Sequence, residues 1–226
     1  MNFILEGLMF ISLGGLIAAF QSGFTLYAIL LKAVASVFFV LAGIYGFCRT
    51  KGSRKVSGTM LTALVCSLVG DVLLALDEGE GILFVLGVVS FAAAHILFSR
   101  AFCIVSGVQK ADVIAAVLVF VALMPILYLG NFDFQGLLPV LVGYAAIISF
   151  MMVKALSLWR CRQGRKRFVL LVMVGGVLFL ASDIVLLFWL FGIGMPKEVQ
   201  SVNWVLYYLA QGCLSSSLNE ENGGEM

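Results

Sequence analysis

The sequence predicts an all-α membrane protein, a bundle of about eight transmembrane helices with both termini in the cytoplasm. Of the 226 residues, 62% are hydrophobic and 12% are charged, and the mean hydropathy is +1.13. Soluble domains are about half apolar and about a quarter charged. Apolar runs recur along the chain at lengths close to the roughly 20 residues that cross a bilayer. Lysine and arginine gather in two short loops, as expected for a multi-pass topology.

The apolar runs are separated by polar or glycine-rich breaks and predict eight helices. The first and second runs are joined by residues 21–23 alone, and the last run is short and carries several polar residues, so a seven-span arrangement stays open. We expect a single transmembrane helical domain over residues 1–218 and a disordered polar tail over 219–226. The predicted helices are Phe3–Phe20, Phe24–Cys48, Ser57–Leu76, Ile82–Ile104, Asp112–Leu129, Leu137–Leu158, Phe168–Phe191 and Val202–Leu218.

The two basic loops fix the predicted orientation. Loops rich in lysine and arginine stay in the cytoplasm, so both termini are expected inside, and the DEGEG turn at 77–81 and the NFDFQG turn at 131–136 outside. Topology accounts for these basic residues and no aromatic residues interleave with them, so we expect no nucleic-acid partner. The basic residues are Arg49, Lys51, Arg54 and Lys55 after the second run, and Arg160, Arg162, Arg165, Lys166 and Arg167 after the sixth.

The first apolar run is expected to be retained as a span. It lacks a basic region before it, carries Glu6 and has no small-residue cleavage site. The five cysteines are scattered singly without a CxxC pair, so neither disulfides nor a structural zinc site are expected. With a compact length and no eukaryotic retention signal, the chain is expected to be an integral, multi-pass protein of a bacterial inner (plasma) membrane.

Four ionisable side chains lie well inside the predicted spans: Lys32, Asp71, His95 and Asp183. Each costs at least about 2.5 kcal/mol to insert. The two aspartates lie in similar segments, LVGDVLLAL and LASDIVLLF, on helices of the same direction. Each is about 15 residues, or about 22 Å, from its predicted helix start. We therefore expect the two carboxylates to meet across a helix interface, with Gly70 and Ser182 allowing close approach.

The remaining polar residues of the spans have two interpretations each. Lys32 is expected to neutralise one carboxylate, or alternatively to receive a phosphate. His95 is either an interhelical hydrogen-bond partner or a site residue. Asn203, Tyr207 and Gln211 recur every four residues and share one helix face, which is expected to look into the bundle, although Asn203 and Tyr207 would also suit an interfacial belt.

Two carboxylates in a dry site cannot both ionise cheaply, so one is expected to hold a proton. That arrangement suits general acid and base catalysis on a lipid, and it equally suits proton-coupled transport. The sequence contains no GxSxG motif and a single histidine, which excludes a three-histidine metal site. No metal or other cofactor is expected.

Five segments carry a family resemblance: SLVGDVLLAL, SFAAAHILFSRAF, PVLVGYAAIISFMM, GGVLFLASDIVLLF and VLYYLAQ. In this order and spacing they resemble the YhhN-like lysoplasmalogenase family of eight-span membrane proteins. The resemblance runs from the second span to the last. The GD and SD motifs, the AH of the fourth span and the YYxxQ of the last are together specific.

The resemblance implies hydrolysis of the vinyl ether bond of lysoplasmalogens, giving a fatty aldehyde and glycerophosphoethanolamine or glycerophosphocholine. A lysophospholipid would then be the substrate and membrane lipids the surroundings, while headgroup preference and oligomeric state stay open. The catalytic acid and carboxylate would be Asp71 and Asp183, in either order. The substrate would contact Lys32, through its phosphate, and His95, Asn203, Tyr207, Tyr208 and Gln211.

Two other function classes remain as alternatives. A proton-coupled transporter of lipids or small molecules would use the same aspartate pair, but such folds commonly contain repeats of inverted orientation, whereas the repeat here is parallel. A membrane scaffold or binding protein would turn over no lipid.

Overall fold

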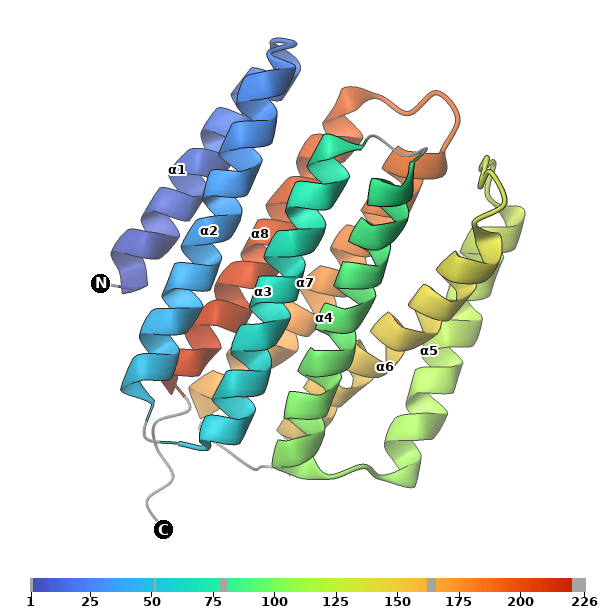
Figure 1. The fold of residues 1–226 in the computed structure, drawn as a ribbon. Coiled ribbons are helices and arrows are strands. Elements are labelled where there is room, and N and C mark those ends of the chain that lie inside the picture. Colours follow the sequence, from blue (N-terminus) through green and yellow to red (C-terminus); the bar gives the residue numbers. More distant parts are fainter. Residues whose placement is uncertain (1, 51, 78–80, 162–165, 221–226) are drawn as a thin grey trace.

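The computed structural model describes residues 2–50, 52–77, 81–161 and 166–220, and for Cys161 the backbone alone. This part of the chain forms eight helices connected by short loops (Figure 1). They are α1 (Asn2–Gln21), α2 (Thr25–Arg49), α3 (Arg54–Leu76), α4 (Ile82–Ser106), α5 (Lys110–Leu129), α6 (Leu138–Cys161), α7 (Lys166–Phe191) and α8 (Lys197–Glu220).

All eight predicted helices are confirmed, most of them to within three residues at each end. The largest difference is in α8, which begins at Lys197 rather than Val202 and ends at Glu220, two residues into the predicted tail. The rest of that tail, 221–226, lies outside the described residues, as do Lys51, Glu78, Glu80, Arg162 and Arg165. Seven helices, α1 to α7, are long and apolar enough to cross a membrane, so the chain is an integral, multi-pass membrane protein.

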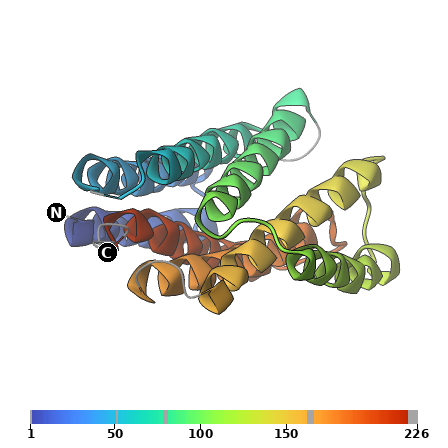
Figure 2. The same ribbon diagram turned by 90° about the horizontal axis from the view of Figure 1, so that it is seen from below.

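Six helices form a closed ring, in which each packs against the next: α2, α3, α4, α6, α7, α8 and back to α2. Outside the ring, α1 packs on α2 and α8, and α5 packs on α6. Viewed along the bundle, α2 and α3 lie on one side, α6 and α7 lie on the other, and α8 lies between α3 and α7 (Figure 2). The ring encloses the polar residues that the sequence placed inside the spans.

The most polar helix, α8, is the most protected from lipid. It packs against α1, α2, α3 and α7, and its buried residues include Gln200, Asn203, Gln211, Ser215 and Ser217. Polar side chains are costly against hydrocarbon but can be satisfied against other helices. The low hydropathy of α8 therefore follows from its central position, and its 24 residues cover about 36 Å, enough to span the bilayer.

The bundle has two distinct ends. α1 begins and α8 ends at the same end (Figure 1), and this end, called the basic end below, carries Arg49 and Arg54 of the first basic loop and Arg160 and Arg167 of the second. α3 and α7 both begin at the basic end, which confirms that the two aspartates lie on helices of the same direction. The placement of the basic end in the cytoplasm stays a prediction.

A buried ion pair joins three helices near the basic end. Lys154 of α6 and Asp112 of α5 are both fully buried, and the Lys154 Nζ lies 2.8 Å from Asp112 Oδ2 and 2.7 Å from the carbonyl oxygen of Gly107. Arg160 pairs with the other carboxylate oxygen. The predicted helix begins at Asp112, but the N-cap is Gln109, three residues earlier, and Asp112 completes a capping box with it.

Replacing Asp112 with alanine is expected to destabilise the bundle by about 3–5 kcal/mol, because the Lys154 ammonium would stay buried without its carboxylate. The double variant Asp112→Ala/Lys154→Met should recover most of that loss, since two apolar groups can replace a buried pair at little cost. Thermal unfolding in detergent measures both. Asp133→Ala, which removes an exposed carboxylate, is the control, and a double variant as unstable as the single one would contradict the interpretation.

Candidate functional site

A polar cavity of about 430 Å³ lies in the half of the bundle remote from the basic end. Its walls come from α1, α2, α3, α7 and α8, with Phe91 of α4 at one side. The apolar part of the wall includes Phe20, Trp189 and Trp204. Both intramembrane aspartates line the cavity, so one space serves both carboxylates. Its polar lining residues include Lys32, Asp71, Asp183, Lys197, Gln200, Asn203 and Tyr207.

Asp71 of α3 is surrounded by hydrogen-bond donors. Its Oδ2 accepts from the Tyr207 hydroxyl at 2.6 Å and from the Ser36 hydroxyl at 2.7 Å. Its Oδ1 lies 3.5 Å from the Lys32 ammonium, which confirms the prediction that Lys32 pairs with a carboxylate. Charge-assisted bonds of this kind favour the ionised carboxylate, and the side chain is 2% exposed. These contacts hold the buried Asp71 carboxylate in a fixed position.

A second layer of α8 side chains holds these donors in place. Gln211 Nε2 donates to the Tyr207 hydroxyl at 3.0 Å. The Tyr208 hydroxyl donates to the Lys32 carbonyl oxygen at 3.0 Å and lies 3.0 Å from Ser36 Oγ. Tyr208 and Gln211 therefore act behind the cavity wall, whereas Lys32, Asn203 and Tyr207 are part of it.

Asp183 of α7 has a different set of neighbours. Its Oδ2 accepts from the Tyr144 hydroxyl at 2.8 Å and lies 3.3 Å from His95 Nε2, and that nitrogen lies 2.8 Å from the Tyr144 oxygen. His95 is fully buried, and its ring packs edge-on against Phe179 with centroids 4.6 Å apart. The Asp183 side chain is 12% exposed, more than that of Asp71.

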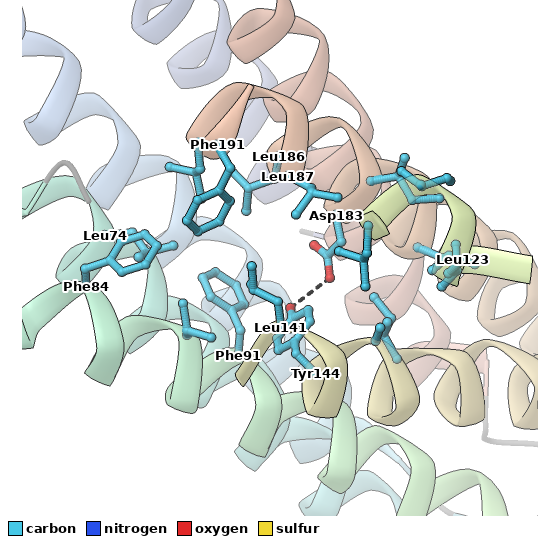
Figure 3. Close-up of a pocket in the computed structure, with 18 residues that line it drawn as sticks. Leu74, Phe84, Phe91, Leu123, Leu141, Tyr144, Asp183, Leu186, Leu187 and Phe191 are labelled. Atoms are coloured by element: carbon cyan, nitrogen blue, oxygen red, sulfur yellow. Dashed lines mark hydrogen bonds between the residues drawn. The ribbon is translucent and has the colours of Figure 1, made fainter. Parts of the chain in front are cut away.

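A second, apolar cavity of about 90 Å³ reaches the same aspartate (Figure 3). It lies between α4, α5, α6 and α7, and its wall is made of leucine, isoleucine, valine and phenylalanine apart from Ala145, Tyr144 and Asp183. Its wall includes Phe84 and Phe191, whose ring centroids lie 6.1 Å apart. Figure 3 shows the Asp183 carboxylate among these apolar side chains, bonded to Tyr144. Residues common to both cavities are Leu74, Phe91, Asp183, Leu186 and Leu190.

The expected direct contact between the helices of the two aspartates is wrong. In the described part of the chain α3 and α7 do not pack on each other, and each carboxylate has its own partners. Gly70 packs instead against the Phe91 ring of α4, and the Ser182 carbonyl oxygen accepts from Asn203 Nδ2 at 2.8 Å. The cavity, and not a helix interface, brings the two aspartates together.

The two carboxylate clusters repeat one pattern. His95 follows Asp71 by 24 residues, and Tyr207 follows Asp183 by the same 24 residues. Each of these residues lies beside the aspartate of the other hairpin: Tyr207 donates to Asp71, and His95 Nε2 lies 3.3 Å from Asp183. A donor from the preceding helix completes each cluster, Ser36 of α2 for Asp71 and Tyr144 of α6 for Asp183. Each aspartate is thus in contact with a side chain from the other half of the ring.

Comparison with known protein families gives one result that covers almost the whole chain. The sequence model of the YhhN family matches residues 9–218, which include both carboxylate clusters, the whole of α2 to α7 and most of α1 and α8. The chain belongs to the YhhN family. Comparisons with curated proteins and with solved structures give no match.

Sequence reasoning missed two donors in this YhhN protein, Ser36 and Tyr144. Ser36 lies one helical turn after Lys32, so the spacing of four residues would have placed it on the same face. Tyr144 stands in the segment PVLVGYAAIISFMM, which carried part of the resemblance to the YhhN family. A tyrosine near the middle of a span was a detectable signal, since its hydroxyl needs a partner there.

Gly70 of this YhhN protein is expected to tolerate no side chain. A Cβ at Gly70 would lie 2.7 Å from the Phe91 ring, which forms part of both cavities, so Gly70→Ala should lower the free energy of unfolding by about 1–3 kcal/mol through overpacking. Gly58→Ala in the same helix is the matched control, because its nearest neighbour would be 3.7 Å away. Alanine favours a helix by about 0.5–1 kcal/mol over glycine, so the control should be slightly stabilised. Equal unfolding temperatures in detergent would contradict the assignment.

Proposed function

We propose that this protein hydrolyses the vinyl ether bond of lysoplasmalogens within the membrane, releasing a fatty aldehyde and glycerophosphoethanolamine or glycerophosphocholine. The observation that carries the proposal is the position of Asp183, which lines both a polar cavity that holds Asp71 and an apolar cavity that contains no other charged residue of the described chain. A lysoplasmalogen has its vinyl ether bond at the junction of a polar headgroup and an apolar chain. Bound across the two cavities, it would present that bond to the carboxylates.

The surroundings of the two aspartates suit different roles. Asp71 faces the Lys32 ammonium and two hydroxyl donors, so we assign it as the ionised carboxylate. Asp183 has no lysine or arginine within 4.0 Å in the described part of the chain, and it lies against the apolar cavity, where the alkenyl chain of the substrate would bind. We therefore assign Asp183 as the proton donor, and Tyr144 and His95 as residues that orient it.

The tautomer of His95 fits this assignment. Its Nδ1 is buried without a hydrogen-bond partner in the described part of the chain, so a protonated ring would leave a buried N–H unbonded, which is costly. In the neutral ring with hydrogen on Nε2, the Nε2–H donates to the Tyr144 oxygen and the Tyr144 hydroxyl donates to Asp183 Oδ2. Oδ1 of Asp183 is then the oxygen that carries the transferable proton.

The reaction needs one acid, one carboxylate and water. The proton of Asp183 moves to the β-carbon of the vinyl ether, whose π electrons form the new C–H bond, and an oxygen lone pair makes the oxocarbenium ion. The charge of Asp71 stabilises that cation. Water adds to the α-carbon and passes a proton to the Asp183 carboxylate. The resulting hemiacetal breaks its C–O bond to the glycerol, giving aldehyde and alcohol, so one water is consumed and both aspartates return to their first state.

Water can reach the carboxylates because the cavity that holds them is polar and spacious. Its volume of about 430 Å³ compares with the roughly 30 Å³ that one water occupies in the liquid. The apolar cavity of about 90 Å³ offers water few partners beyond Asp183 and Tyr144. We therefore assign the apolar side to the alkenyl chain and the polar side to the glycerol and the attacking water.

Asp71→Asn and Asp183→Asn are each expected to lower the rate of aldehyde release from a lysoplasmalogen by at least about 10²-fold, the lower range for loss of general acid–base catalysis. Asn keeps the shape of Asp, so helix content measured in detergent should change little, although Asp71→Asn should lower the unfolding temperature because it leaves the Lys32 ammonium without its carboxylate. Asp133→Asn is the control for loss of a carboxylate. Full activity of both site variants in a coupled aldehyde assay would overturn the proposal, and proton-gradient-driven uptake without aldehyde would favour the transporter alternative.

Hydrolysis in D₂O should place one deuterium on the aldehyde carbon next to the carbonyl, because that carbon is the one that Asp183 protonates. Mass spectrometry of the aldehyde, trapped as it forms, measures the label. The 1-alkyl ether and 1-acyl analogues of the substrate should give no aldehyde, since they contain no vinyl double bond to protonate. An unlabelled aldehyde would exclude the protonation step.

A further inference from the structure

One face of α8 lines the polar cavity along its whole depth. Lys197, Gln200, Trp204 and Tyr207 all lie on the cavity wall, and their spacing of three, four and three residues places them on a single helix face. Lys197, the first residue of α8, is about 15 Å along the helix from Tyr207, which bonds to Asp71. The residues on this face between the carboxylates and the end of the helix have no role in the chemistry proposed above.

Two buried polar atoms on this face lack a partner. Gln200 is 9% exposed and Trp204 is 5% exposed, and neither the Gln200 Oε1 nor the Trp204 Nε1 has a hydrogen-bond partner in the described part of the chain. Buried polar atoms are nearly always bonded. An acceptor and a donor left open on the wall of one cavity are therefore a pair of ready contacts for a polar ligand.

A cation lies at the same level of the cavity. The exposed Lys197 places its Nζ 5.6 Å from the centre of the Phe20 ring, and within the described residues no carboxylate lies within 4.0 Å of it. Phe20 packs against Trp204 with ring centroids 4.9 Å apart. Lys32, the other cation on the cavity wall, is already paired with Asp71. Lys197 is thus the cation that an anionic group of a ligand can engage.

The matching face of α4 is apolar. The repeat that relates Asp71 to Asp183 and His95 to Tyr207 also relates Val85 to Lys197, Val88 to Gln200 and Ala92 to Trp204. Val88 lines the apolar cavity, as Gln200 lines the polar one. The hairpins α3–α4 and α7–α8 are the two copies of this repeat. The face of α8 is polar and the matching face of α4 is apolar, which fits a ligand with one polar and one apolar part.

From these observations we infer that Lys197, Gln200 and Trp204 form a subsite for the phosphoethanolamine headgroup of the lysolipid. The Lys197 ammonium and the Trp204 Nε1–H donate to the phosphate oxygens, and Gln200 Oε1 accepts from the primary ammonium. Choline, which has no N–H, cannot make the last bond, so the subsite favours ethanolamine. The inference rests on the proposed function for the orientation of the lipid.

Binding tests the subsite without turnover. The wild-type protein and Lys197→Gln are titrated in detergent with 1-O-alkyl-glycero-3-phosphoethanolamine, which has no vinyl ether bond, and with 1-O-alkylglycerol, which has no phosphate. Lys197→Gln should weaken binding of the phospholipid about tenfold, the effect of losing one charge-assisted bond, and leave binding of the alkylglycerol unchanged. Lys110→Gln, at the exposed first residue of α5, should change neither affinity.

A second variant separates the two halves of the headgroup. Gln200→Leu should remove the preference for the ethanolamine over the choline form of the alkyl lysolipid, with binding of the alkylglycerol again unchanged. Glycerophosphoethanolamine and inorganic phosphate, titrated alone, distinguish a lipid site from a site for free phosphate esters: the lysolipid should bind more tightly than either in the wild-type protein.

Equal affinities of Lys197→Gln and the wild-type protein for the phospholipid, or an equal loss for phospholipid and alkylglycerol, would overturn the subsite. So would tighter binding of free phosphate than of the lysolipid. These results are independent of chemistry, because no step uses a hydrolysable bond. If no vinyl ether is cleaved but the affinities change as expected, the proposed function fails and the headgroup subsite stands.

Discussion

The structure depends on the burial of two carboxylates inside a helical ring. A buried carboxylate is tolerated only where polar groups meet it. Here each aspartate accepts from the helix before it, Ser36 for Asp71 and Tyr144 for Asp183, and has a neighbour from the other half of the ring. Tyr207 of α8 crosses to Asp71, and His95 of α4 crosses to Asp183. These two contacts between the halves therefore hold the hairpins α3–α4 and α7–α8 in one register, and both carboxylates line one cavity.

These contacts explain why the most polar helix lies in the centre. From α8, Tyr207 donates to Asp71 and Tyr208 donates to a backbone carbonyl of α2. Asn203 of the same helix donates to the backbone of α7. A helix with that many hydrogen-bonding side chains cannot face lipid. The apolar helices α1 and α5 lie outside the ring and are the least buried of the seven apolar helices, so the sequence of each helix reflects its distance from the carboxylates.

The fold and the two aspartates were predictable because each leaves a signal in the sequence itself: apolar runs of fixed length, basic loops, and charges where none are expected. Lys32 could be paired with a carboxylate on depth alone. The contact of His95 with Asp183 could not be predicted, because sequence order does not bring α4 beside α7. Tyr144 lies on the helix directly before α7, so its bond to Asp183 was within reach of the sequence. Lys154 was overlooked for a related reason: one turn from a helix end it could have reached water, and only the fold brings it to Asp112.

Close packing at the basic end and cavities at the other end are two aspects of one arrangement. A Cβ at Gly46 would lie 2.8 Å from Leu218, and one at Gly176 would lie 2.7 Å from Ala155, so α2 approaches α8, and α7 approaches α6, more closely than larger residues allow. The Asp112–Lys154 pair joins α5 to α6 at the same level. Large side chains at the other end, among them Phe91, Trp189 and Trp204, keep the helices apart and line the open space. The basic end therefore fixes the helix positions, and the opposite end leaves open the space between a polar α8 and an apolar α4 in which we propose that the substrate binds.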